Sequence, residues 1–464
     1  MTPSPIKAVY VALLCVSLSA CGSLFSSAKP TVDLTPQMQS ALPAAPADEV
    51  VVEAAWWTVF NDPVLNQLQA QLLQGNLNLQ LMGSQVAQAQ ASLAVAQSSL
   101  WPSLSIQAGA ARAQDKGGSS SNQLSVNAPL SWEWDVWGRL ASQTNAAQAS
   151  LRASQADLAM VRLSAQATLV QTYVALRAAE RQLNVLAQAE QAYDKALSLT
   201  RYRYEAGVVS AADVAQAQVQ LATTQAARID VQSTRLQLQN ALAVLLGLTP
   251  GELKLSASEV WPDLPPLPAQ LSSTLLQRRP DIRAAQQRVL AAQAQLGAAQ
   301  AAFFPTFNFS ANLGYRSTEL SNVFSASQLL WSLGPSMALQ LIDGGQRQAV
   351  KAEARAALDG AGIGYRQTVL QALQEVEDNL VLTQQLQQQA RAQTQAWQAA
   401  QRNLEIAQTQ YAAGTVSYLN VVTAQALALN AQRSLLDIES RQVLAGNQLL
   451  KNFAGQWPTE PAQP

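Results

Sequence analysis

The chain carries the same ordered set of landmarks twice, about two hundred residues apart. Residues 204–214 are matched by residues 411–421, 207 positions further on (411 − 204), with a shared Tyr-x-x-Gly-x-Val-Ser pattern. Two shorter segments, residues 100–103 and 135–139, recur in the same order as residues 303–306 and 343–347. This spacing is far longer than the roughly 20–50 residues of a solenoid repeat. Each half is therefore predicted to be a complete architectural module.

Charge is scarce in this chain, and the missing residue types exclude several functions. Charged residues make up 13% of the positions, against about 25% in an average soluble protein. The net charge of −1 gives no general attraction for nucleic acid. With no histidine, the chain lacks imidazole base catalysis and the commonest metal ligand. Because no catalytic carboxylate pair or phosphate loop is recognisable either, the sequence predicts neither an enzyme nor a cofactor-binding protein.

The N-terminus has the pattern of a targeting segment. A lysine precedes an apolar stretch over residues 8–19, which is too short to span a membrane and suits a signal peptide. The Leu-Ser-Ala-Cys sequence ending at Cys21 resembles the lipobox of bacterial lipoproteins. That resemblance predicts a signal peptide over residues 1–20 and covalent lipid on Cys21; an ordinary signal peptide with a chance cysteine is the alternative. Residues 21–53, rich in Pro, Ala and Ser, are expected to form a tether.

Four segments between the helical tracts alternate apolar and polar side chains, as two-faced strands do. They cover about residues 103–113, 123–135, 305–316 and 331–342. Each has about the length of a tilted membrane-spanning strand, ~9–11 residues. Their polar positions hold mainly Ser, Asn, Gln and Gly, with few of the Lys and Glu typical of a soluble surface. A membrane sheet is therefore favoured over four strands of a soluble sandwich.

Large aromatic residues cluster near the ends of these segments, where the interfacial girdles of membrane barrels lie. The predicted girdle is Trp101, Trp132, Trp134, Trp137, Phe303, Phe304 and Trp331. Four strands cannot close a barrel, and an open edge cannot lie in lipid, so the chain is expected to oligomerise. Two copies would give eight strands around a filled bore, and three copies twelve strands around a lumen. Pro129 and Pro335 remove ladder donors and are expected at bulges or subunit edges.

Long helical tracts without proline follow each strand pair. Residues 140–204 and 348–411 are predicted to be helices of about 64 residues, each roughly 95 Å long at ~1.5 Å per residue. Helices are expected to return over residues 209–246 and 416–453, and shorter ones to precede the strand pairs over residues 77–100 and 281–302. Gly360, Gly362 and Gly364 are expected to mark a bend or close packing. A plain coiled-coil rod would not explain the symmetric placement of strands between the helices.

The repeated signature lies at the predicted tips of the two helical hairpins, about residues 204–210 and 411–417. Gly207 and Gly414 are expected in left-handed turns, where other residues are strained. Ser210 and Ser417 are expected to cap the returning helices with their hydroxyl groups. Because the tips are exposed, they are also predicted to dock a partner. The tip residues are Gly207, Val208, Val209, Ser210, Gly414, Thr415, Val416 and Ser417.

With these features the chain resembles the TolC/OprM family of outer-membrane efflux proteins, and more closely its lipoprotein (NodT-type) branch. The resemblance rests on residues 56–63 (WWTVFNDP), residues 279–282 (RPDI), residues 304–305 (FP), residues 343–345 (DGG) and the Tyr and Gly of residues 411–414. It covers about residues 54–455, together with the lipobox. Each motif alone is weakly specific, whereas their order, spacing and duplication together are strong.

The resemblance implies a mixed α and membrane-β fold. Three chains would form a 12-stranded outer-membrane β-barrel, four strands from each, continuous with a long periplasmic α-helical barrel. A collar around the helical barrel would draw on residues 64–76, residues 247–277 and the C-terminal segment. The implied divisions are a first repeat over residues 54–250, an equatorial linker over 251–278, a second repeat over 279–455 and a C-terminal tail over 456–464.

The implied function is the exit duct of a tripartite efflux pump, which passively exports drugs or other small molecules across the outer membrane. Its partners would be a periplasmic adaptor (membrane fusion) protein at the tips and an inner-membrane transporter of the RND type. The duct would need no cofactor beyond lipid on Cys21. A type I protein secretion duct and a scaffold lipoprotein without a pore are the alternatives. Copper-specific export is disfavoured, because the chain has no His and only five Met.

The family closes its periplasmic end with inward side chains, often acidic, near the second hairpin. Leu404, Glu405 and Tyr411 lie at about the matching place and are the candidate gate. For Glu405 a solvated helix position is an equal alternative. The second tip, residues 411–418, contains no acidic residue, which departs from the family's charged gate.

Overall fold

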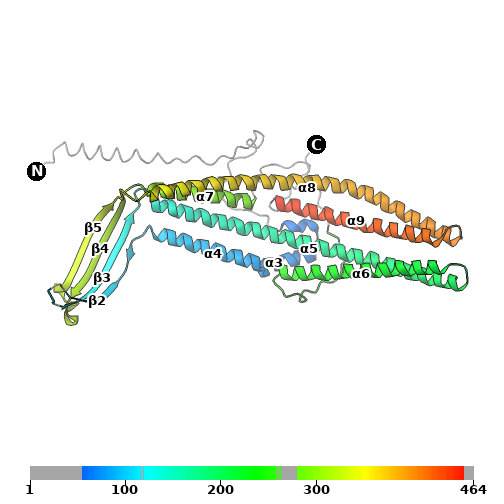
Figure 1. Cartoon of the computed structure of the whole chain (residues 1–464), viewed down its shortest axis with the longest axis horizontal. Coiled ribbons are helices and arrows are strands. Elements are labelled where there is room, and N and C mark those ends of the chain that lie inside the picture. Colours follow the sequence, from blue (N-terminus) through cyan, green and yellow to red (C-terminus); the bar gives the residue numbers. More distant parts are fainter. Residues whose placement is uncertain (1–54, 115–116, 119, 259–260, 263–278, 454–464) are drawn as a thin grey trace, which may run out of the picture. The chain divides into compact units, whose positions relative to one another are not determined.

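The computed structural model describes residues 55–114, 117–118, 120–258, 261–262 and 279–453. Four of the expected features lie outside the described residues: the signal peptide, Cys21, the tether and the C-terminal tail. Most of the expected equatorial linker lies outside them as well. The described part consists of helices and one antiparallel sheet (Figure 1).

Two long helices and their returning partners repeat with identical lengths. Helix α5 (Arg139–Glu205) and helix α8 (Gln346–Ala412) have 67 residues each. The returning helices, α6 (Ala211–Leu245) and α9 (Tyr418–Asn452), have 35 residues each. Helix α8 begins 207 positions after α5 (346 − 139), and α9 begins 207 positions after α6, the same offset as between the tips. The duplication therefore extends to the length of every helix in the two hairpins.

Shorter helices complete a curved layer. Helix α3 (Pro63–Gly75) leads into α4 (Leu77–Ser98), and α7 (Pro280–Ala301) precedes the second strand pair. Next to the sheet the helices pack in the order α4, α5, α7, α8, and towards the hairpin tips in the order α6, α5, α9, α8 (Figure 1). Helix α8 thus lies at one edge of the layer, and α4 and α6 lie at the other.

Of the bend or close packing expected at three glycines of α8, the close packing is absent within this chain. The helix runs unbroken through Gly360, Gly362 and Gly364, and a Cβ atom at any of them would meet no other atom within 4 Å. Close backbone approach occurs instead between Gly75, at the end of α3, and Gly247, just after α6. A side chain at either position would collide with the backbone of the other segment.

The sheet contains β1 (Ser103–Leu104), β2 (Gln107–Gln114), β3 (Ser120–Trp134), β4 (Thr306–Ser317) and β5 (Leu329–Ala338). Strands β1 and β2 both pair with β3, followed by β4 and then β5. Strand β5 begins and ends earlier than residues 331–342, the range expected for the fourth strand. All neighbours are antiparallel, and β5 forms one edge of the sheet in this chain.

Pro129 splits the first strand without shifting it. Strands β1 and β2 keep one register against β3, since Leu104 pairs with Leu130 and Gln107 pairs with Asn127. The Ser105 amide donates to the Pro129 carbonyl at 3.1 Å, but Pro129 has no N–H to donate in return. The expectation of a bulge is therefore wrong, because the ladder loses one bond and keeps its register. Pro335 pairs in register with Phe309 and lies on the edge strand β5.

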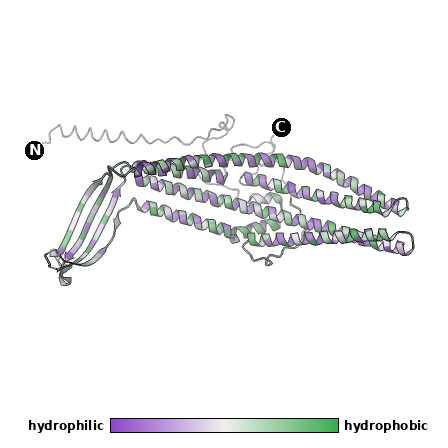
Figure 2. Cartoon of the chain, in the orientation of Figure 1, coloured by the Kyte–Doolittle hydropathy of each residue, from purple (hydrophilic) through white to green (hydrophobic). Residues whose placement is uncertain are grey.

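The register gives the sheet two chemically different faces. Partners directly opposite one another share a face, so Val126, Tyr315 and Leu329 lie together on the apolar face. On the other face Ser131 lies opposite Ser310, which lies opposite Gly334. Figure 2 shows the resulting alternation of hydrophobic and hydrophilic residues along the strands. One face is thus suited to an apolar solvent, and the other to water.

The largest buried core surrounds the middle of α5. Asp62 caps α3 by accepting hydrogen bonds from the amides of Val64 (2.8 Å) and Leu65 (3.2 Å), with Pro63 at the first helical position. This cap turns the chain from the short 3₁₀ helix Trp56–Phe60 into α3, and both elements pack on α5. We call this group the collar core; its members include Trp56, Trp57, Phe60, Leu65, Leu68, Leu72, Leu169, Val170, Leu176, Leu242 and Leu450.

Candidate functional site

A trough with a volume of about 910 Å³ crosses the helix layer. Residues of α4, α5, α7 and α8 all line the trough. The face of the helix layer that carries the trough is therefore concave. Apart from Ala and one Val, its lining is mainly amides and hydroxyls, namely Gln85, Gln88, Ser92, Gln143, Ser150, Ser154 and Gln295. Two charged residues, Arg139 and Glu353, also line it. The trough is therefore a surface that hydrogen-bonds water while carrying little charge.

The repeated Asp-containing segments are the joints between sheet and helix. Asp135 accepts hydrogen bonds from the amides of Leu140 (3.0 Å) and Ala141 (2.7 Å), and so caps α5. Asp343 does the same for α8, accepting from the amides of Gly345 (2.9 Å) and Arg347 (3.3 Å). An acidic cap is favourable there, because it satisfies free amides and opposes the helix dipole. The sequence revealed this repeat, but its capping role became apparent only from the geometry.

Four of the predicted girdle residues contact other parts of the chain, and the other three are exposed. Next to the helices, the Trp137 ring stacks on Phe304 with centroids 4.7 Å apart, and its indole N–H donates to the Pro305 carbonyl at 2.8 Å. These contacts join the two repeats at the base of the sheet. Phe303 packs beside two cations of α8, and the indole of Trp132 donates to the Leu100 carbonyl at 3.0 Å. The residues Trp101, Trp134 and Trp331 are all more than 60% exposed.

The hairpin tips confirm the expected turns and correct one expected cap. Gly207 and Gly414 have φ values of 72° and 74°, in the left-handed region. Ser210 forms a reciprocal capping box, in which its hydroxyl accepts from the Asp213 amide (3.3 Å) and the Asp213 carboxylate accepts from the Ser210 amide (2.9 Å). Ser417 makes no side-chain cap, so that expectation is wrong. The two tips therefore share a turn but differ in how the following helix begins.

Near the tips the two hairpins pack against each other. The tip cluster consists of Leu197, Ala217, Ala407, Tyr418, Val421, Val422 and Ala424, from all four long helices. Of the candidate gate residues, Leu404 and Tyr411 pack against this cluster, while Glu405 is exposed. The Arg203 guanidinium lies 4.9 Å from the centre of the Tyr411 ring, and the rings of Tyr411 and Tyr418 are 5.3 Å apart. The three gate candidates thus do not form one constellation within a single chain.

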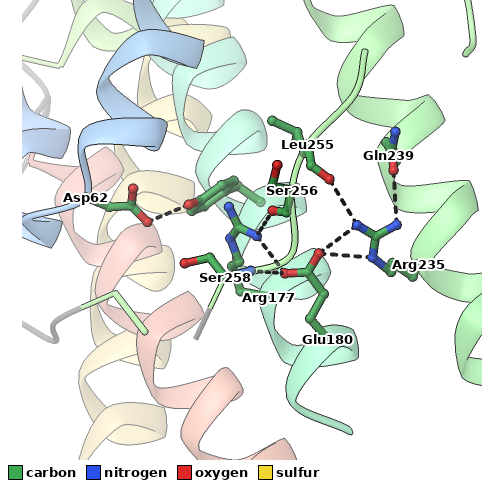
Figure 3. A network of polar contacts seen from close by, with 9 residues as sticks. Asp62, Arg177, Glu180, Arg235, Gln239, Leu255, Ser256 and Ser258 are labelled. Carbon is green, nitrogen blue, oxygen red and sulfur yellow. Dashed lines mark hydrogen bonds and ion pairs between the residues drawn. The ribbon is translucent and has the colours of Figure 1, made fainter. Parts of the chain in front are cut away.

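A buried ionic network ties α5, α6 and the linker together (Figure 3). Glu180 accepts hydrogen bonds from Arg177 at 2.6 Å and from Arg235 at 3.0 Å. Arg177 also donates to the Ser256 carbonyl, and Arg235 to the Leu255 carbonyl, both at 3.1 Å. The side chains of Arg177 and Glu180 are only 2% and 4% exposed. This collar network was missed from the sequence, because an Arg and a Glu three positions apart on a helix usually form an exposed pair.

Titration behaviour in the collar follows from this burial. Burial alone would lower the pKa of Arg177, but its hydrogen bonds to Glu180 and Tyr173 raise the pKa above the usual value. Burial and a hydrogen bond to Asp62 raise the pKa of Tyr173. The Tyr173 hydroxyl donates to the Asp62 carboxylate at 2.5 Å. The collar therefore keeps Arg177 charged and Tyr173 protonated at physiological pH.

The part of the chain that the structure describes has neither a metal-binding cluster nor a membrane-spanning helix. No group of three or more Cys, Asp or Glu side chains there is arranged to hold a metal ion. None of the described helices combines the length and hydropathy needed to cross a membrane.

Comparison with known proteins identifies the family. The family model described as outer membrane efflux protein matches residues 68–248 and 271–455. The chain belongs to this family. It is 28% identical over 437 residues to the probable efflux pump outer membrane protein TtgC of Pseudomonas putida, covering 92% of this chain and 90% of TtgC. It is also 28% identical to the probable outer membrane lipoprotein SilC of Salmonella typhimurium, covering 89% and 90%.

Solved structures agree with this assignment. The outer-membrane channel OprN matches with a TM-score of 0.83 and 28% identity, covering 93% of this chain and 97% of OprN. The CmeC outer membrane channel of Campylobacter jejuni matches with a TM-score of 0.85 and 25% identity, covering 93% and 94%. The resemblance to efflux channels inferred from the motifs is therefore confirmed.

Proposed function

We propose that this efflux protein is the exit duct of a tripartite pump, through which small molecules pass passively to the outside of the cell. The observation that carries the proposal is the two-faced sheet followed by a concave, nearly uncharged trough. In a closed assembly the apolar face would contact lipid, while the polar face and the trough would form one wet wall. The relatives TtgC and OprN, named as an efflux pump outer membrane protein and an outer-membrane channel, support this function.

The duct is a trimer in this proposal. Within the chain, β5 and the interrupted strand β1–β2 each have one neighbour in the sheet, and an unpaired edge cannot lie in lipid. Rotational symmetry would pair β5 of one copy with β1–β2 of the next and close the ring. Three copies supply twelve strands, enough for an aqueous lumen, whereas eight strands would leave a bore filled by side chains. The same symmetry would seat α8 of one copy against α4 and α6 of the next.

The exposed apolar side chains of the edge helices support this assembly. On α8, the side chains of Ile363 and Leu370 are 69% and 55% exposed, whereas many other apolar residues of the chain are buried. On the opposite edge, Leu77 of α4 and Ile229 of α6 are 66% and 68% exposed. Apolar surface on both edges, far from the sheet, is expected where neighbouring copies pack.

The hairpin tips are the proposed contact with a periplasmic adaptor, which in turn would join an inner-membrane transporter of the RND type. Residues 207–210 and 414–417 are the farthest points of the hairpins from the sheet, and Val208 is 71% exposed. Lipid on Cys21 would add an anchor in the outer membrane. The naming of SilC as an outer membrane lipoprotein supports that anchor.

Glu405, which is exposed, is the proposed charge at the periplasmic gate. Leu404 and Tyr411, which pack against the tip cluster, are the other proposed gate residues. If Glu405 narrows or charges the closed entrance, Glu405→Ala should raise the closed-state conductance in planar bilayers. Gln408→Ala, at an exposed position on the same helix, is the matched control and should leave the conductance unchanged. An unchanged conductance in Glu405→Ala would remove Glu405 from the gate.

Liposome swelling tests the export function itself. The purified full chain, reconstituted into liposomes, should admit sugars and small neutral drugs at rates that depend on solute size. Protein that keeps its helical signal and yet leaves the liposomes sealed would indicate a scaffold without a pore.

A further inference from the structure

The trough has one charge that the chain leaves uncompensated. Its two charged lining residues are Arg139 and Glu353. Arg139 forms an ion pair with Glu133 at 2.7 Å, so its charge is balanced where the trough meets the sheet. Glu353 is exposed, and it takes part in none of the ion pairs formed by the described residues. The remainder of the lining is amide, hydroxyl or apolar.

No described neighbour on α8 forms an ion pair with Glu353. Positions three and four residues away, which are its neighbours on a helix, hold only Ala349, Val350, Ala356 and Ala357. The nearest cations in sequence, Lys351 and Arg355, each lie two positions away, on a different side of the helix. Lys351 packs against the Phe303 ring at 5.7 Å, and Arg355 pairs with Asp359 at 3.4 Å. The carboxylate of Glu353 is therefore free to act on the space inside the trough.

The neighbouring copy offers no partner either, if the proposed ring is correct. In that ring α8 adjoins α4 of the next chain, and α4 (Leu77–Ser98) contains no Asp, Glu, Lys or Arg. Three copies would then place three Glu353 carboxylates around the ring, each in a trough whose other lining groups are neutral or paired.

We propose that Glu353 determines the charge preference of the outer part of the duct, so that cationic solutes are favoured over anionic ones. This inference rests on the proposed duct function and names the class of solute that the wall favours. Physically, a fixed negative charge raises the local concentration of cations and lowers that of anions. The effect reaches ~10 Å at 0.1 M salt and ~3 Å at 1 M salt, so it should be strong only at low ionic strength.

Zero-current potentials in planar bilayers test the proposal, using full-length protein in a KCl gradient. Wild type should favour potassium over chloride, and Glu353→Gln should reduce the permeability ratio by about twofold at 0.1 M salt, with the difference fading at 1 M. Glu353→Asp, which keeps the carboxylate, should keep the wild-type preference for potassium. The matched control is Glu377→Gln, an exposed glutamate of α8 outside the trough, which should leave the ratio unchanged.

The outcomes separate the two proposals. If wild-type protein forms no conducting pores, the duct function fails. If it conducts, and Glu353→Gln leaves the permeability ratio at the wild-type value, the duct stands and Glu353 is excluded as the determinant. An equal drop in Glu353→Gln and Glu377→Gln would also overturn the inference, because a general change of surface charge would then explain the effect.

Discussion

The two helical hairpins have the same length but are held in different ways. In the first, α5 and α6 are locked to the linker by the buried collar network of Arg177, Glu180 and Arg235. At the offset of 207 positions, the second hairpin has Gln384, Gln387 and Gln442 in their places. Gln442 contributes one hydrogen bond, from its amide to the Leu386 carbonyl at 3.2 Å.

At the tips, too, the first hairpin has a stabilising side-chain contact that the second lacks. The first returning helix begins with the Ser210–Asp213 capping box, whereas the second begins without a side-chain cap and has Asn420 in the place of Asp213. Helix α8 also has few buried residues in the single chain, whereas α5 is buried along much of its length. The comparison indicates that the first hairpin is held by more contacts within the chain than the second. In the proposed trimer, the second hairpin would depend more on the neighbouring copy.

The largest effect should come from breaking the collar network. Glu180→Gln would leave Arg177 and Arg235 without their carboxylate in a buried site, and losing one partner of a buried pair costs about 3–5 kcal/mol. The equivalent change in the second hairpin, Gln387→Ala, affects an exposed amide and should cost less than about 0.5 kcal/mol. Denaturant midpoints of the purified assembly would measure both. Equal losses in the two variants would refute the asymmetry between the hairpins.

Changes at the helix caps should have smaller effects on stability, with a loss at the first tip and a gain at the second. Asp213→Ala removes the box at the first tip and should cost about 1 kcal/mol locally. Asn420→Asp would allow a box with Ser417 at the second tip and should stabilise it by a similar or smaller amount. Hydrogen exchange of the tip amides would show faster exchange in the first variant and slower exchange in the second. Faster exchange in Asn420→Asp would mean that a feature other than the missing cap loosens the second tip.

The smallest effect concerns alkaline pH. The pKa of Tyr173 is raised in the fold, so its contribution to stability is present below the ordinary tyrosine pKa of ~10 and is lost as pH rises beyond it. The equivalent position in the second repeat is Leu380, which does not titrate. Between pH 10 and 11, Tyr173→Phe should therefore lose less stability than wild type does, as followed by thermal unfolding. Parallel pH profiles for the two proteins would show that Tyr173 does not cause the alkaline loss.

The sequence predicted the architecture better than the interactions that hold it. The repeat offset, the long helices, the alternating strands and the glycine turns all follow from local patterns, which depend on periodicity and backbone preference. The collar network did not, because Glu180 meets Arg235 only once α6 has folded back along α5. The Ser417 cap was expected because Ser210 and Ser417 occupy equivalent positions, but only Ser210 caps its helix, and only Ser210 is followed three residues later by an acidic partner. The sequence correctly predicted that Pro129 removes a hydrogen-bond donor from the strand ladder. The result is one missing hydrogen bond in an unchanged register, not a bulge.

In the proposed assembly three copies close one duct, and the mass of the intact complex tests this number of copies. Native mass spectrometry of the full chain, extracted from outer membranes in mild detergent, should give a complex of three chains. Twelve strands would then be available to close a barrel without an unpaired edge. A folded monomer or dimer as the main species would contradict the account, because four or eight strands cannot form the proposed aqueous wall.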